Sequence, residues 1–246
     1  MEHLPLAGRR VLVPRRDDPT IAAALRAAGA EVDQCDFTQR QAFRSAELDR
    51  AADLAAAGTY HWVALTSGFT VRALSEAGQP LASLIAPNSR TAAVGSATAA
   101  AMTAAGVHVD LVPLASEGGA ALAAVWPPGT GRVLIPGAQA SARALPVALA
   151  EKGWDVTTVA VYRTVPCRGV PPEIAGRAGA GTYLALVVTA GSVAEAAATL
   201  VGVSMPVVAI GEPSAVAARR AGFRRVALAR STSAADVVAA VVSLVD

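Results

Sequence analysis

The sequence predicts an α/β protein that contains two similar domains. Short apolar runs alternate along the 246-residue chain with alanine-rich helical segments, each of which ends at a glycine. The runs are apolar throughout, which is typical of parallel strands covered on both faces. Three such strand–turn–helix units occur twice in the same order, and each resulting half has an ordinary domain size.

The elements can be assigned in order along the chain. The first strand is expected at 11–13; Asp18 can cap the next helix, Pro19 suits its first turn, and Gly29 ends it. Further strands are expected at 62–65, 92–94, 133–135, 186–188 and 207–210. Their helices are expected to end at Gly78, Gly106, Gly153, Gly202 and Gly222. The segment 126–131, rich in proline and glycine, is predicted to be a surface loop.

An internal repeat links three pairs of these units. The paired positions are Val11 and Val133, Thr66 and Thr189, and Gly95 and Gly211. The repeat does not decide which units share a sheet: two contiguous halves, and two halves that exchange their first units, fit it equally. The segments 33–42 and 160–170 have no helical period and are expected to connect the domains.

Composition excludes several classes of protein. With 53% hydrophobic and 16% charged residues, the chain does not have the composition of a disordered protein. Its net charge is +2, and the sequence contains no basic run suited to binding nucleic acid. No uncharged stretch is typical of a spanning helix and no secretory signal is visible, so we expect a cytoplasmic protein without membrane contact. Cys35 and Cys167 are too few for a disulfide framework and are expected as free thiols.

Common catalytic and cofactor motifs are absent. The sequence contains no G-x-G-x-x-G after a strand, no Walker A motif and no G-x-S-x-G nucleophile elbow. His3, His61 and His108 do not have the spacing of metal ligands. We therefore expect neither a cofactor nor a metal.

Small polar residues follow several of the predicted strands. The turns lie at 66–68, 95–98, 189–192 and 211–214. In a parallel sheet such turns gather at the carboxyl edge, where helix N–H groups and hydroxyls bind anions. For any single turn, a hydroxyl that only caps its own helix is the favoured alternative. Four turns in two domains instead favour a polyanionic ligand held between them. The candidate residues are Thr66, Ser67, Gly95, Thr98, Thr189, Gly211 and Ser214.

Two arginines follow the matching first strands of the repeat. Arg15 and Arg143 lie just beyond 11–13 and 133–135, and either guanidinium could bind a carboxylate through two hydrogen bonds. The alternative for each is a solvated surface arginine, and for Arg143 the two interpretations are equally weighted.

Several motifs occur in a characteristic order. They are VLVPR at 11–15, Thr66-Ser67, VGSATAAAMTAAG at 94–106, VLIPG at 133–137, VYRTVP at 161–166 and AIG at 209–211. Together they resemble the uroporphyrinogen-III synthase family over essentially the whole chain. The resemblance implies two Rossmann-like or flavodoxin-like parallel-sheet domains, with the chain crossing twice through a two-stranded linker. Domain 1 would comprise 1–34 with 168–246, and domain 2 would comprise 35–167, with Cys35 and Cys167 near each other in the linker.

The resemblance also implies an activity. Members of this family are lyases of tetrapyrrole, porphyrin and heme biosynthesis. They remove water from hydroxymethylbilane, a linear tetrapyrrole with eight carboxylates, and close the ring with inversion of ring D to give uroporphyrinogen III. No cofactor is needed, because the protein holds the substrate in a reactive conformation. The resemblance further implies a monomer in transient contact with porphobilinogen deaminase.

The resemblance assigns roles to particular residues. Tyr162 matches the linker tyrosine proposed to assist departure of the hydroxyl group, since a phenol can donate a proton; the alternative is that it only packs on a strand. Substrate binding is carried over to Arg15, Thr66, Ser67, Thr98, Thr189 and Ser214. The family turn Thr-Ser-Pro is altered here, with Gly68 in one copy and Ala190-Gly191 in the other.

Two other functions fit the same residues. One is a non-catalytic, synthase-like sensor of a tetrapyrrole or another polyanion; the retained Tyr162 argues against it and Ala190 argues for it. The other is a generic two-domain protein that binds a phosphorylated or carboxylated metabolite. Turnover of the tetrapyrrole substrate distinguishes both from a synthase.

Overall fold

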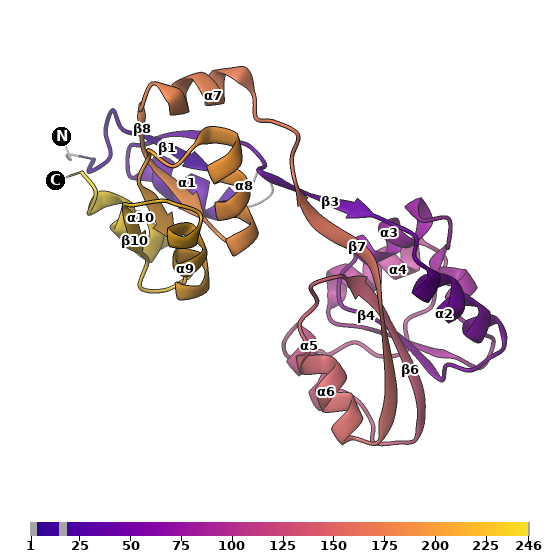
Figure 1. The fold of residues 1–246 in the computed structure, drawn as a ribbon. Coiled ribbons are helices and arrows are strands. Elements are labelled where there is room, and N and C mark those ends of the chain that lie inside the picture. Colours follow the sequence, from indigo (N-terminus) through magenta and orange to yellow (C-terminus); the bar gives the residue numbers. More distant parts are fainter. Residues whose placement is uncertain (1–3, 15–18, 246) are drawn as a thin grey trace. The chain divides into compact units, whose positions relative to one another are not determined.

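The computed structural model describes residues 4–14 and 19–245, and it contains two compact α/β units (Figure 1). Unit 1 comprises Met1–Gln39 and Val165–Asp246, and unit 2 comprises Arg40–Thr164. The division shows that the first strand and helix fold with the last third of the chain. Asp18, the predicted helix cap, and Arg15 lie outside the described residues.

Unit 1 contains a parallel sheet with helices on both faces. Its strand order is β10-β9-β8-β1-β2, and all neighbours are parallel. The strands are β1 (Arg10–Val13), β2 (Glu31–Gln34), β8 (Tyr183–Val188), β9 (Val207–Ala209) and β10 (Val226–Leu228). The helices are α1 (Pro19–Ala27), α7 (Pro172–Gly179), α8 (Gly191–Val201), α9 (Glu212–Arg220) and α10 (Ala234–Val242).

The alternation of side chains along β1 explains this layering. Val11 and Val13 are buried against α1 and α10, whereas Leu12 is buried in the cluster that includes α7, α8 and α9. Since neighbouring residues of a strand face opposite sides, a strand covered on both sides must be apolar at every position. This is the apolar run that predicted the strand.

Unit 2 repeats the arrangement. Its strand order is β3-β7-β6-β4-β5. The strands are β3 (Thr38–Ala42), β4 (Trp62–Leu65), β5 (Arg90–Ala93), β6 (Gly131–Ala138) and β7 (Trp154–Pro166). The helices are α2 (Ala46–Ala56), α3 (Phe69–Glu76), the 3-10 helix η1 (Leu81–Leu84), α4 (Ser96–Ala104), α5 (Gly119–Val125) and α6 (Ala144–Glu151). The strands β4 to β7 are parallel, so their carboxyl ends share one edge.

The edge strand β3 runs antiparallel to β7. The Phe43 N–H donates to the Val161 carbonyl at 3.0 Å, and the Cys167 N–H donates to the Phe37 carbonyl at 2.8 Å. Cys35 is buried and Cys167 is half-buried, and no disulfide joins them in the part of the chain that the structure describes. Burial raises the pKa of the Cys167 thiol, and the nearby Asp36 carboxylate raises it further.

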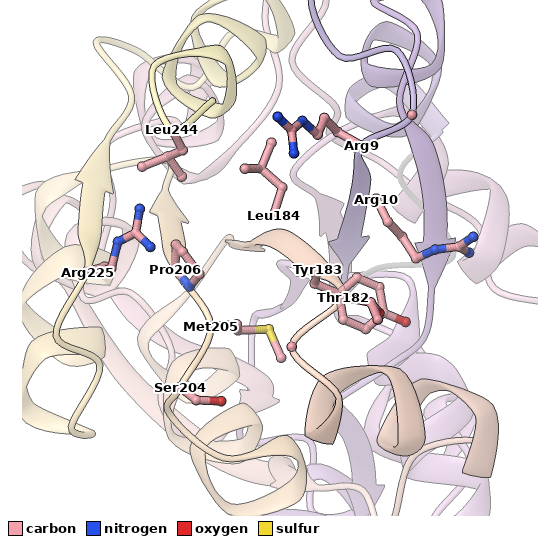
Figure 2. A pocket seen from close by; sticks show the side chains of 12 residues that line it. Arg9, Arg10, Thr182, Tyr183, Leu184, Ser204, Met205, Pro206, Arg225 and Leu244 are labelled. Atoms are coloured by element: carbon pink, nitrogen blue, oxygen red, sulfur yellow. The ribbon is translucent and has the colours of Figure 1, made fainter. Parts of the chain in front are cut away.

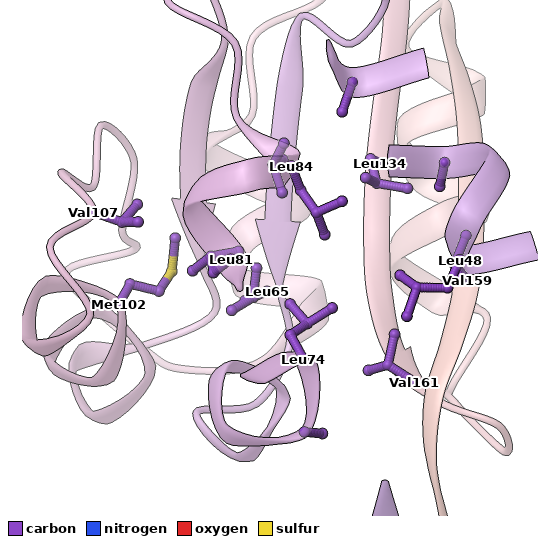
Figure 3. Packing of buried hydrophobic residues seen from close by; sticks show 14 of the residues in the cluster. Leu48, Leu65, Leu74, Leu81, Leu84, Met102, Val107, Leu134, Val159 and Val161 are labelled. Atoms are coloured by element: carbon purple, nitrogen blue, oxygen red, sulfur yellow. The ribbon is translucent and has the colours of Figure 1, made fainter. Parts of the chain in front are cut away.

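Two apolar clusters form the core of unit 2, one on each face of its sheet. Figure 3 shows the first, in which Leu48 of α2 and Leu74 of α3 pack with strand residues such as Leu134. The second lies beneath α5 and α6 and contains Trp126, whose ring centroid is 4.8 Å from that of Trp62. Trp126 is 1% exposed, so the prediction of a surface loop was wrong at this residue: its large apolar ring fills the space under α5.

The predicted α/β class with parallel sheets is confirmed. Each expected strand lies at or within two residues of an observed one, and the predicted helix-ending glycines all have positive φ: Gly29, Gly78, Gly106, Gly153, Gly202 and Gly222. No helix in ranges 4–14 and 19–245 is long and apolar enough to cross a membrane.

Candidate active site

A cavity of about 260 Å³ opens at the carboxyl edge of the unit 2 sheet. Its polar walls include Thr66, which follows β4, and Gln139 and Ser141, which follow β6. Arg143, at the N-cap of α6, also lines the cavity. The parallel sheet thus gathers residues that are far apart in sequence at one edge, as the turns predicted.

Gly137 keeps the middle of this cavity open. A Cβ atom at this position would lie 3.2 Å from the Ser141 Oγ and 3.7 Å from the Thr66 Oγ1. The missing side chain therefore leaves space between two hydroxyl groups. Gly137 ends the VLIPG motif. The sequence did not predict Gly137, Gln139 or Ser141 as site residues, because only the pairing of β4 with β6 brings them close to Thr66.

Arg143 supplies the positive charge of the cavity. It is exposed, it is the one charged residue among those that line the cavity, and in the described part of the chain its guanidinium has no hydrogen-bond or ion-pair partner. A guanidinium without a counter-charge beside two hydroxyls is suited to a carboxylate. Sequence reasoning weighted binding and a solvated role for Arg143 equally, and the structure places it on the cavity wall.

Ser67 has a different environment from its neighbour Thr66. Its Oγ accepts a hydrogen bond from the Phe69 N–H at 3.3 Å, and it is not among the residues that line the cavity. This hydroxyl caps its own helix, which is the alternative interpretation considered for each turn. The prediction that Ser67 binds substrate stays a prediction.

The turn at Gly95 already contains a carboxylate of the chain itself. The Ser96 N–H and hydroxyl donate to the Glu117 Oε1 at 2.8 and 2.7 Å, and these two bonds lower the pKa of Glu117 below its ordinary value. A Cβ on Gly95 would lie 2.5 Å from the Glu117 Cδ, so glycine is needed here for the carboxylate to approach. Thr98, one turn into α4, is only 7% exposed and does not line the cavity.

Two predicted turns of unit 1 lie side by side at the carboxyl edge of its sheet. Thr189 follows β8 and Gly211 follows the adjacent strand β9. A Cβ on Gly191 would lie 3.0 Å from the Ala217 Cβ, so α8 begins close against α9. Ala190, at the N-cap of α8, offers no side-chain acceptor, and Ser214 in the first turn of α9 is 6% exposed.

The starts of these two helices retain free donors. In the described residues the N–H groups of Gly191, Ser192, Glu212 and Ser214 have no hydrogen-bond acceptor. Such unpaired N–H groups together with the helix dipole favour anions. Ala190 contributes no hydroxyl here, but this backbone donor set does not depend on its side chain.

Tyr162 lies on β7 level with the end of β6. It pairs in register with Ala138, and its carbonyl accepts from the Gln139 N–H at 2.8 Å. Its ring packs edge-on against Phe69, with centroids 4.9 Å apart, on the face covered by α3. The cavity instead extends toward α6 and does not include the Tyr162 side chain. The site therefore combines Thr66 with Arg143 in one cavity, and Tyr162 lies at the same edge of the sheet.

The Tyr162 hydroxyl differs from its ring in its surroundings. The residue is 7% exposed, yet within the described ranges its hydroxyl has no hydrogen-bond partner and is not among the fully enclosed polar atoms. A phenol that no protein group engages can donate to a substrate. The guanidinium groups of Arg40 and Arg72 lie 5.1 and 5.9 Å from the Phe69 ring centroid, so the aromatic pair has cations beside it.

Comparison with known proteins now decides the family. A model of the family described as uroporphyrinogen-III synthase HemD matches residues 20–239. The chain belongs to the uroporphyrinogen-III synthase family. This family and its fold support synthase activity in the tetrapyrrole pathway as the function of the chain, and the sensor alternative is not favoured.

Solved synthases share the fold of the whole chain. The chain is similar to a mutant uroporphyrinogen III synthase from Thermus thermophilus, at 20% identity and a TM-score of 0.54, over 96% of this chain and 98% of that one. It is also similar to uroporphyrinogen-III synthetase from Helicobacter pylori, at 15% identity and a TM-score of 0.60, over 96% and 99% of the two chains. No curated protein matches the sequence.

Proposed function

We propose that this synthase converts hydroxymethylbilane to uroporphyrinogen III as a cyclising lyase, with loss of water and inversion of ring D. The observation that carries the proposal is the family match over residues 20–239. The polar character of the site supports it, because the substrate presents carboxylates and the site offers arginine, hydroxyl and backbone donors.

The cavity of unit 2 binds one substrate carboxylate in this proposal. The Arg143 guanidinium supplies charge-assisted hydrogen bonds, and the Thr66 and Ser141 hydroxyls lie on either side of the open space at Gly137. The free N–H groups at the starts of α8 and α9 bind further carboxylates. Arg15, Ser67, Thr98, Thr189 and Ser214 keep the binding roles that the resemblance implies, and Gly95 and Gly211 keep the roles predicted from their turns.

Tyr162 assists the step that needs a proton. The carbon–oxygen bond of the substrate's hydroxymethyl group breaks, and a proton donated toward the departing hydroxide gives water. The pyrrole nitrogen supplies the electron pair and loses its proton, which leaves an electrophilic azafulvene that the substituted α-carbon of ring D attacks to give a spiro intermediate. The bond from this carbon to its original methylene then breaks, the methylene rejoins at the other α-carbon of ring D, and that carbon loses its proton, so ring D is inverted. The protein contributes substrate conformation and proton donation, so proximity accounts for most of the rate.

The domain organisation follows the family pattern in this proposal. Domain 1 comprises 1–34 with 168–246, and domain 2 comprises 35–167 with its two linker strands. The division of the compact units at 39–40 and 164–165, and the antiparallel pairing of β3 with β7, support it. We further propose that the synthase is a cytoplasmic monomer that receives substrate in transient contact with porphobilinogen deaminase.

A coupled assay tests the activity. Porphobilinogen and porphobilinogen deaminase are incubated with and without this chain, and the oxidised porphyrins are resolved into isomers. Hydroxymethylbilane closes spontaneously to isomer I, so the reaction without the chain provides the background. We expect a shift to isomer III. Isomer I alone, from protein that circular dichroism shows to be folded, contradicts the proposal and favours the non-catalytic relative.

A further inference from the structure

A second cavity, of about 390 Å³, opens at the other edge of the unit 1 sheet. Most of its lining residues lie just before the strands β1, β8, β9 and β10 or in the first residues of β1 and β8. The exception is Leu244, which follows α10. Because these strands are parallel, the cavity lies at the amino edge of the sheet. The strand β8, Tyr183–Val188, separates the two edges by roughly 20 Å at about 3.3 Å per residue. The cavity is therefore distinct from the carboxyl-edge turns.

Two arginines provide positive charge to this cavity. Figure 2 shows Arg9 and Arg225 on opposite walls, with Leu184 between them. In the part of the chain that the structure describes, neither guanidinium has a hydrogen-bond or ion-pair partner, and none of the 12 lining residues is acidic. Arg10 differs, because its guanidinium turns away and pairs with Glu31 and Asp33.

The space between the arginines is apolar. Met205 and Pro206 are buried there, and Leu184 and Leu244 are partly buried. Ser204 adds a hydroxyl with no partner in the described ranges. An apolar surface between two uncompensated cations is complementary to a molecule with an apolar middle and an anionic group at each side. The cavity volume lies within the range of about 300–1,000 Å³ that small-molecule sites occupy.

We propose that the amino-edge cavity of unit 1 binds a small organic dianion, in which two phosphate or carboxylate groups flank an apolar ring or chain. Arg9 binds one anionic group and Arg225 binds the other. The site is independent of the proposed synthase chemistry, because it lies at the opposite edge of the unit 1 sheet from the carboxyl-edge turns.

The test measures binding of defined probes to the full chain. Terephthalate and para-benzenediphosphonate carry two anionic groups across an aromatic ring, and benzoate is the matched monoanion. We expect saturable binding of at least one dianion by calorimetry, about tenfold tighter than benzoate, as loss of one charge-assisted contact predicts. The dianion that binds more tightly identifies the ligand source as phosphorylated or polycarboxylate.

Two arginine variants and a matched control locate the binding site. Arg9→Ala and Arg225→Ala are each expected to weaken dianion binding about tenfold. The control Arg224→Ala removes an adjacent exposed arginine that does not line the cavity, and its affinity is expected to match wild type. All three positions are exposed, so folding is retained, which circular dichroism checks.

Nuclear magnetic resonance shifts give an independent readout. Dianion binding is expected to move the amide signals of Gly8, Thr182 and Ser204. The proposal is overturned if the shifts centre on Gly191 and Gly211 at the carboxyl edge, if Arg9→Ala and Arg225→Ala bind like wild type, or if neither dianion saturates by about 10 mM. None of these measurements depends on turnover, so failure here is separable from failure of the proposed synthase activity.

Discussion

The environment of Tyr162 separates a chemical role from a packing role. The ring contributes to the core through Phe69, whereas the hydroxyl has no partner in the residues described. Tyr162→Phe therefore removes the proposed proton donor and retains the packing surface. We expect kcat to fall while the free energy of unfolding changes by less than about 0.5 kcal/mol. Isomer analysis and urea titration measure the two quantities, and wild-type turnover in folded Tyr162→Phe removes this residue from the mechanism.

Gly137 allows a steric test of the cavity. Its φ is not in the left-handed region, so a side chain is compatible with the backbone, but it would enter the space between Thr66 and Ser141. Gly137→Val is expected to raise KM more than it lowers kcat, because it fills a carboxylate subsite. The control is Gly176→Ala, since a Cβ there meets nothing within 4 Å. Steady-state kinetics with an unchanged KM in Gly137→Val would show that this cavity does not bind substrate.

The carboxylate of Glu117 tests the role of the Gly95 turn. If the Ser96 N–H and hydroxyl bind a substrate carboxylate, Glu117 must first leave them. Glu117→Gln weakens this competing bond, so we expect a KM a few-fold lower than wild type, in line with about 1 kcal/mol for one hydrogen bond. The measurement is KM in the coupled assay. An unchanged or higher KM means that Glu117 is a helix cap and that Gly95 does not contact substrate.

At the scale of elements, Asp33 joins α7 to the sheet of unit 1. Its Oδ2 accepts from the Arg177 Nη1 at 2.8 Å and from the Tyr183 hydroxyl at 2.7 Å. Burial by itself raises the pKa of Asp33, but these bonds and the nearby guanidinium groups outweigh it and hold the pKa below its ordinary value. The same cluster raises the pKa of Tyr183, first through burial and then through the Asp33 carboxylate.

This network predicts a pH-dependent stability. Because the folded-state pKa of Asp33 lies below the unfolded value of 3.8, the stabilisation is fully present above that value and is lost as pH falls through the folded-state pKa. Asp33→Asn is expected to lower the free energy of unfolding by about 2 kcal/mol at neutral pH, and by less as acid is added. Urea titrations at several pH values measure it. Asp155→Asn, which breaks an exposed pair with Arg132, is the control expected to change little.

The elements were more predictable than the site because their signals are local. The apolar run 11–13 and the glycine at Gly29 each depend on a few adjacent residues, and both were confirmed. Burial of Trp126 beside Trp62, and the approach of Glu117 to Gly95, depend on tertiary packing that no local pattern records. The internal repeat likewise left open which units share a sheet, because parallel pairing of β1 with β8 brings together distant segments.

At the scale of the molecule, two chain segments connect units that both carry turns proposed to bind anions. The proposed substrate has carboxylates for turns of both units, so we expect a tetrapyrrole ligand to draw the units together. Small-angle scattering of the full chain is expected to show a smaller radius of gyration at saturating ligand. The same experiment with Arg143→Ala uses a ligand concentration too low to fill the weakened unit 2 cavity. It is expected to show a smaller decrease in the radius of gyration. A profile unaffected by saturating ligand argues against closure.

The interrupted sequence of unit 1 also constrains how the chain folds on the ribosome. Its strand β1 pairs with β2, which follows soon after, and with β8, which begins only at Tyr183. Unit 2 lies between them as one continuous segment, Arg40–Thr164. During synthesis, unit 2 is complete before unit 1 can form its central strand pairing, since domains fold as units when their residues have emerged. The nascent β1–α1–β2 segment is therefore expected to wait with one edge of β1 unpaired until β8 has been made.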